Sequence, residues 1–150
     1  LIAWFDTIRQ EILTRPRPLA ALKTDIIAMR EKMFATHPPL DSNVKYARGG
    51  VVDVEFIVQY LILAHARQYP QLLQNYGNIA LLSMAADAAL ISETLAESSR
   101  TAYRHYRKQQ HNTKLRDAVH AEADSELRAH YHTVKALWLA VFDAEAAGGA

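Results

Sequence analysis

The positions of the prolines constrain the fold of this chain more than any other feature. Pro16 and Pro18 follow residues 2–13, whose apolar positions recur at steps of three and four, and Pro38 closes a second such segment that begins near Leu19. This spacing is typical of amphipathic helices. Proline ends a helix because it lacks the amide hydrogen and disfavours helix at the residue before it. The sequence therefore predicts two helices before a loop that extends to the first glycines.

Helical periodicity continues through the rest of the chain, where breaking residues are few. The sequence has 5 Gly in 150 residues, and 50% of its residues are hydrophobic. Residues 51–68 are apolar on all sides and form a run too long for an ordinary strand, so we expect a central buried helix there. Three further helices are expected, with a break at Asn112 and Thr113 before the last: about 79–90, about 92–111 and about 124–141.

These segments together predict an all-α bundle of five to seven helices. A chain of this length suits one domain with one core. We expect that domain to occupy residues 1–142 and to be followed by a flexible tail, residues 143–150, which is rich in alanine and glycine.

The composition argues against several classes of partner. The chain has 17 basic and 16 acidic residues and a net charge of +1, so no excess of positive charge attracts nucleic acid or an anionic membrane. There is no cysteine, which excludes disulfides and thiolate chemistry. The most apolar stretch, residues 51–64, is too short to span a bilayer and contains charged residues. Since the chain begins without methionine, we expect an internal or C-terminal piece of a longer cytoplasmic protein.

The segment RGGVVDVEF, residues 48–56, carries the pattern closest to known chemistry. On a strand, Asp53 and Glu55 would point to one face and could share Mg²⁺. On a helix they would lie about 200° apart and could not. A helix would instead allow Asp53 to stabilise the exposed amides of the first turn. It would also allow the glycine-led helix start, with Lys45 and Arg48 beside it, to bind a phosphate that another domain supplies. The length of the segment favours the helical interpretations.

The same segment carries a family resemblance. Residues 45–63, KYARGGVVDVEFIVQYLIL, resemble the glycine-glycine-x-x-Asp-x-Glu-Phe-x-x-Gln-Tyr signature of glutamine-synthetase adenylyltransferases, and a looser glycine-glycine form occurs in the PII uridylyltransferases. Similar flanking stretches extend the resemblance from Leu1 to about Phe142. One departure is Asn43-Val44-Lys45, where the family commonly has Asp-Leu-Lys. This chain therefore has no aspartate at that position.

The resemblance implies a helical accessory or regulatory domain that follows a nucleotidyltransferase domain absent from this chain. In the bifunctional parent enzyme, that fold transfers AMP from ATP to a tyrosine of glutamine synthetase with Mg²⁺, and a second fold removes the AMP. Glutamine and the PII signal protein control the balance, and with it nitrogen assimilation. We expect this chain to be inactive alone and to hold no cofactor of its own, whereas the parent requires ATP and Mg²⁺.

Two alternatives remain open under the same resemblance. The chain could be a protein-interaction module that binds PII or glutamine synthetase, or the helical domain of a PII uridylyltransferase. Under the leading hypothesis, the residues expected to face the nucleotide-bearing domain are Lys45, Arg48, Gly49, Gly50 and Asp53. Asp53 would then act as the cap of the helix, and the two bases would contact phosphate or acidic side chains.

Other polar residues offer weaker candidates. Arg100, Arg104 and Lys108 recur at four-residue steps and approach His111, so they could form a stripe that binds a partner or an anion. A solvated helix face paired with acidic neighbours explains the same stripe, and we favour it. His130 and His132 diverge on a helix, so no metal site is predicted.

Overall fold

The computed structural model describes residues 2–40, 42–74, 76–115 and 125–143. Within these ranges the chain is helical and contains no strand, so the predicted all-α bundle of five to seven helices is confirmed. The described residues form six α-helices and one short 3₁₀ helix: α1 (Ile2–Leu13), α2 (Leu19–Thr36), α3 (Val51–His65), η1 (Pro70–Leu73), α4 (Asn78–Asp87), α5 (Glu93–Leu115) and α6 (Ser125–Phe142).

The prolines separate the first two helices as predicted. α1 ends before Pro16, and Pro18 directly precedes α2. The last carbonyls of α1 would lack partners at this break, but the Arg17 guanidinium donates to the carbonyl oxygen of Ile12 at 2.7 Å. This contact closes the helix end with a basic side chain, which also suits the helix dipole.

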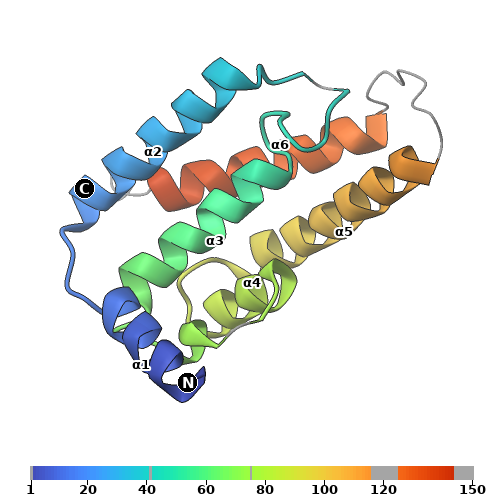
Figure 1. Ribbon diagram of the computed structural model, residues 1–150. Helices are drawn as coiled ribbons and strands as arrows, with labels where there is room; N and C mark the ends of the chain where they lie inside the picture. Colours follow the sequence, from blue (N-terminus) through green and yellow to red (C-terminus); the bar gives the residue numbers. More distant parts are fainter. Residues whose placement is uncertain (1, 41, 75, 116–124, 144–150) are drawn as a thin grey trace.

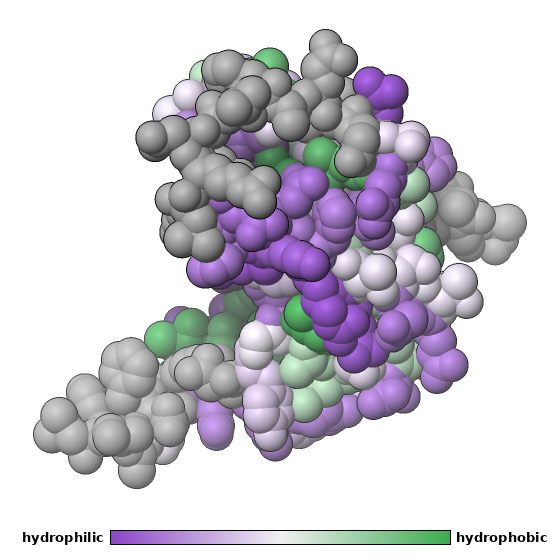
Figure 2. All heavy atoms as spheres, turned by 90° about the vertical axis from the view of Figure 1, so that its right-hand side faces the viewer, coloured by the Kyte–Doolittle hydropathy of each residue, from purple (hydrophilic) through white to green (hydrophobic). Residues whose placement is uncertain are grey.

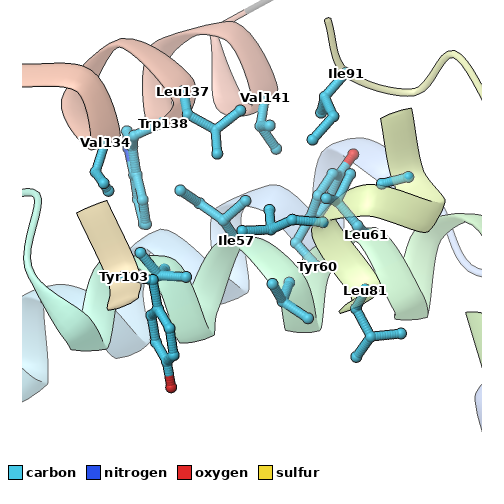
Figure 3. Packing of buried hydrophobic residues seen from close by; sticks show 14 of the residues in the cluster. Ile57, Tyr60, Leu61, Leu81, Ile91, Tyr103, Val134, Leu137, Trp138 and Val141 are labelled. Carbon is cyan, nitrogen blue, oxygen red and sulfur yellow. The ribbon is translucent and has the colours of Figure 1, made fainter. Parts of the chain in front are cut away.

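α3 is the central element, as its sequence predicts. It packs against α2, α4, α5 and α6, and Figure 1 shows it in the middle of the bundle. Val54 and Ile57 are fully buried. Figure 3 shows Ile57 and Leu61 of α3 among buried residues of α6 such as Leu137. A helix that packs against four others needs a largely apolar composition.

Three helix ends differ from the prediction. α3 ends at His65 rather than at residue 68, and a turn follows it. α5 runs through Asn112 and Thr113 to Leu115 without the expected break. Both residues cost a helix only a few tenths of a kcal/mol, which does not end it. α4 ends at Asp87 because Ala89 adopts a φ of 59°, the left-handed conformation that turns the chain after many helices. The predicted helix to about residue 90 was therefore too long.

No helix within the described ranges is both long and apolar enough to cross a membrane. Of the predicted flexible tail, only Asp143 lies among the described residues.

Candidate functional site

The loop before α3 folds onto the start of that helix. The amide of Val51 donates to the carbonyl oxygen of Val44 at 2.8 Å, and the amide of Val52 donates to that of Lys45 at 3.0 Å. The first amides of a helix lack partners within the helix and are the groups that bind anions. Here the chain's own carbonyls occupy two of them, which leaves this helix end poorly suited to a phosphate.

The two glycines are required by close approaches of the backbone. Gly49 has a φ of 82°, and a Cβ there would lie 2.3 Å from the carbonyl oxygen of Tyr131. A Cβ on Gly50 would lie 2.2 Å from the carbonyl oxygen of Val44. Only glycine fits both positions without moving the backbone of α6 or of the loop.

Asp53 lies in the interior and binds both the loop and α2. The Arg30 guanidinium donates from Nε to Asp53 Oδ1 at 2.8 Å and from Nη2 to Oδ2 at 2.6 Å. The Gly49 amide also donates to Oδ2, at 2.7 Å. The Asp53 side chain is fully buried, and that of Arg30 is 11% exposed. A two-bond contact between these planar groups is among the strongest polar contacts in proteins.

Aromatic residues surround this ion pair. The Arg30 guanidinium carbon lies 3.8 Å from the ring centroid of Trp138 on α6 and 5.2 Å from that of Phe34 on α2. A guanidinium over an aromatic face is attracted by the ring electrons, and more strongly where water is excluded. The pair is therefore held from α2, α3 and α6 at once.

Tyr106 of α5 completes the arrangement. Its hydroxyl donates to the carbonyl oxygen of Gly49 at 2.7 Å. Burial raises the pKa of Tyr106, and Tyr131 and the negative charge of Asp53 raise it further, so the phenol stays protonated and able to donate. We call Arg30, Gly49, Asp53 and Tyr106 the Arg30–Asp53 network.

The structure separates the two carboxylates of the signature. Because residues 51–65 are helical, Asp53 points into the interior and Glu55 lies at the surface. The oxygens of Asp53 are already bound to Arg30 and Gly49. Asp53 and Glu55 therefore cannot bind one Mg²⁺ together, and the structure does not support the hypothesis that they are paired metal ligands.

Only part of the predicted interface lies on the surface. Gly49, Gly50 and Asp53 are buried, so of the five residues predicted for this interface only Lys45 and Arg48 are placed for direct contact with another domain. Both of these are exposed, and Arg48 Nη1 lies 3.8 Å from Glu31 Oε1. The buried three shape the loop that carries the two bases.

The predicted basic stripe lies along α5. Arg104, Lys108 and His111 are exposed, whereas Arg100 is half-buried and binds Glu97 at 2.7 Å. Figure 2 shows the side of the molecule on which α5 lies, and hydrophilic residues form a broad band across it. The Arg100–Glu97 pair is of the kind that the solvated-face interpretation expects. Binding of a partner to the stripe stays a prediction.

A second exposed surface was not predicted. Glu55 and Gln59, four residues apart on α3, line a groove of about 650 Å³ together with apolar residues of α1 that include Ile8 and Ile12. Residues four apart lie on one face of a helix. The groove is open and largely apolar, with two polar side chains of the signature on its wall.

Sequence reasoning missed Arg30, although a signal for it exists. The buried residues of α2 are Leu22, Ile26, Arg30 and Phe34, spaced by four. An arginine in register with a buried apolar stripe must find a buried acid, because an unpaired charge in the interior is very costly. Asp53 is the only carboxylate among the buried polar residues of the described chain.

Comparison with known proteins supplies the family. The family model described as GlnD PII-uridylyltransferase matches residues 19–137, from the start of α2 to α6. The bifunctional glutamine synthetase adenylyltransferase/adenylyl-removing enzyme of Neisseria meningitidis serogroup A is 73% identical over 143 residues. The enzymes of the same name from Chromobacterium violaceum and Burkholderia mallei are 50% and 44% identical over 139 and 145 residues.

The chain belongs to the glutamine synthetase adenylyltransferase/adenylyl-removing enzyme family. The alignments cover 93–95% of the chain but only 16% of each of these three relatives. The chain thus matches one segment of these much longer relatives. The family signature that its sequence resembles supplies two members of the Arg30–Asp53 network, Gly49 and Asp53.

Proposed function

We propose that this chain is a helical accessory domain of a bifunctional enzyme that attaches AMP to a tyrosine of glutamine synthetase and removes it. In this proposal the domain performs no chemistry. It positions a nucleotidyltransferase domain elsewhere in the same enzyme, which uses ATP and Mg²⁺, and it receives regulatory signals such as those of the PII protein.

The observation that carries the proposal is the burial of Asp53 against Arg30. The acidic residue that most resembles a metal ligand is bound on both oxygens and has no exposed surface. A carboxylate in this state supports the architecture of the domain rather than a reaction. The names of the relatives supply the reaction of the whole enzyme.

The exposed residues of the signature supply the proposed contact surface. The architecture accounts for Gly49, Gly50 and Asp53, but Glu55 and Gln59 face the groove beside α1. We propose that this groove faces the nucleotidyltransferase domain. Lys45 and Arg48, in the loop before α3, are proposed to contact phosphate or acidic side chains of the same enzyme.

Positive charge introduced at the groove tests this surface. In the full-length enzyme, Glu55→Lys with Gln59→Lys is expected to lower AMP transfer to glutamine synthetase at least tenfold while the unfolding midpoint stays within a few degrees of the parent. Asp25→Lys, at an exposed position of α2, is the matched control and should leave transfer unchanged. Normal transfer by the groove variant would remove the groove from the proposal.

A second experiment tests whether the domain acts alone. The 150-residue chain, incubated with Mg·ATP and glutamine synthetase, is expected to transfer no AMP. Labelled glutamine synthetase in that mixture would contradict the proposal. Capture of purified PII or glutamine synthetase by the same chain would favour the interaction-module alternative.

A further inference from the structure

Three side chains that could bind a metal meet where α5 packs against α6. They are His105 of α5 and Glu126 and His130 of α6, and their possible ligand atoms all lie within 4.8 Å of one another. Glu126 Oε1 is 3.8 Å from His105 Nδ1 and 3.8 Å from His130 Nε2. The two imidazole rings are also close, with centroids 4.7 Å apart.

The sequence could not reveal this cluster. From the sequence, His130 was considered as a metal ligand only together with His132, which lies two residues along α6 and is exposed. Glu126 and His130 are four residues apart and share a face of α6, as residues at this spacing do. His105, more than 20 positions away in the sequence, joins them only because α5 packs on α6.

We propose that His105, Glu126 and His130 form a binding site for a divalent transition-metal ion, Zn²⁺ in the first instance. Zinc binds imidazole nitrogen and carboxylate oxygen at about 2.0–2.2 Å, so two ligands of a tetrahedral ion lie about 3.4 Å apart. The two distances of 3.8 Å come close to this value. The Glu126 side chain is 68% exposed and can rotate to close the remaining gap.

The surroundings of His105 suit a ligand. The side-chain amide of Gln109 lies 3.2 Å from His105 Nε2, on the far side of the ring from the Nδ1 that faces Glu126. The Gln109 atom nearest Nε2 is the amide nitrogen, and a half-turn of the amide would put its oxygen there, where it would accept the Nε2 proton and leave the Nδ1 lone pair for the ion. Histidine ligands of metals characteristically donate their other ring N–H to such a partner.

The chemistry of the donor set selects the kind of ion. Two imidazoles and one carboxylate suit zinc and similar ions, whereas Mg²⁺ prefers oxygen ligands alone. Three protein ligands leave a fourth position open to water or to a group from elsewhere.

The position of the site gives binding a structural consequence. The ring of Tyr106 lies edge-on to that of His130, and Tyr106 binds the Gly49 carbonyl. Tyr131, the next residue of α6, lies with its carbonyl against Gly49. An ion that joins α5 to α6 here would stabilise both helices where they hold the glycine turn.

Zinc titration of the untagged 150-residue chain tests the proposal, with affinity read by competition against a chromophoric chelator. We expect one Zn²⁺ per chain at the tightest site, and a rise in the unfolding midpoint with Zn²⁺ but not with Mg²⁺, because a ligand of the folded state alone stabilises it. His105→Gln and His130→Gln should each weaken that site by more than about 100-fold, beyond the 10–100-fold of a second-shell change. His132→Gln, on the same helix, should change nothing.

Two further measurements keep the test independent of folding. Glu126→Gln changes an exposed side chain, so it should leave the metal-free unfolding midpoint unchanged and still weaken zinc binding. Nitrogen NMR of the histidine rings should show zinc-dependent shifts at Nδ1 of His105 and Nε2 of His130. Zinc affinity that is equal in the parent and in all three ligand variants would overturn the proposal, as would the absence of binding at micromolar zinc.

Discussion

The guanidinium of Arg30 on α2 binds both carboxylate oxygens of Asp53 on α3, at 2.8 and 2.6 Å, in the interior of the bundle. Asp53 also binds the Gly49 amide, whose own carbonyl accepts from Tyr106 of α5. One acidic residue of the family signature thereby joins the loop, α2 and, through Gly49, α5.

Removing the charge of Asp53 is expected to destabilise the domain strongly. Asp53→Asn leaves the Arg30 guanidinium buried without its counter-charge, and breaking such a pair costs about 3–5 kcal/mol. Urea unfolding followed by circular dichroism measures this loss. Arg48→Met, which removes an exposed contact to Glu31, is the control and should cost about 1 kcal/mol or less. Equal stability of the two variants would contradict a supporting role for the Arg30–Asp53 pair.

A methyl group at Gly49 is expected to disrupt the turn. Gly49→Ala combines a left-handed φ of 82° with a Cβ placed 2.3 Å from the Tyr131 carbonyl oxygen, and we expect a loss of about 3 kcal/mol or more. Gly77→Ala is the control, because no atom lies within 4 Å of its Cβ position and its φ is −70°. Its free energy of unfolding should change by less than about 1 kcal/mol. The same urea titration compares the two, and the interpretation of Gly49 fails if their losses are alike.

The Tyr106 hydroxyl is expected to contribute through a single hydrogen bond. Tyr106→Phe leaves the buried Gly49 carbonyl without this donor, which costs about 1–3 kcal/mol. Tyr76→Phe removes a hydroxyl from a residue that is 50% exposed and should have little effect. Thermal unfolding of both variants distinguishes them. A Tyr106→Phe variant as stable as the parent would mean that the hydrogen bond contributes nothing net.

Acid is expected to weaken the fold through His65. Burial and the positive charge of Lys23 lower the pKa of His65 below 6.5, so the unfolded chain binds this proton more readily than the folded one. The stability that neutral His65 contributes is therefore complete above about pH 6.5 and is lost as the pH falls through the lower folded pKa. Between pH 7.5 and 5, the parent should lose more unfolding free energy than His65→Gln. Identical losses in the two proteins would show that the His65 pKa is not lowered.

The architecture was predictable where local chemistry decides it. Pro16, Pro18 and Pro38 mark helix ends by steric exclusion, and the long, mostly apolar run at residues 51–68 predicted the central position that α3 occupies. The predicted break at Asn112 and Thr113 was wrong because neither residue excludes a helical conformation. The length of α5 is instead set by its packing on α6 and α4. A helix length that is set by tertiary contacts cannot be predicted from the local sequence pattern.

The candidate site was predictable only in part. The glycines and Asp53 stood out as a string, but their partners Arg30, Tyr106 and Tyr131 lie on three other helices. Two signals together predict that Asp53 faces inward. The first is its place in the first turn of a buried helix, and the second is an arginine in the apolar stripe of α2. The second signal is visible in the sequence, because Arg30 lies four residues from both Ile26 and Phe34.

The most direct test of the account uses the full-length enzyme with Asp53→Asn. Two quantities are measured: the unfolding midpoint, and the turnover number for AMP transfer at a temperature well below that midpoint. If Asp53 supports the fold, the midpoint falls and turnover of the still-folded enzyme stays within about tenfold of the parent. If Asp53 takes part in the reaction, turnover falls by roughly 10²–10³ or more, the scale of losing a catalytic group, while the midpoint hardly moves. That second result would contradict the account.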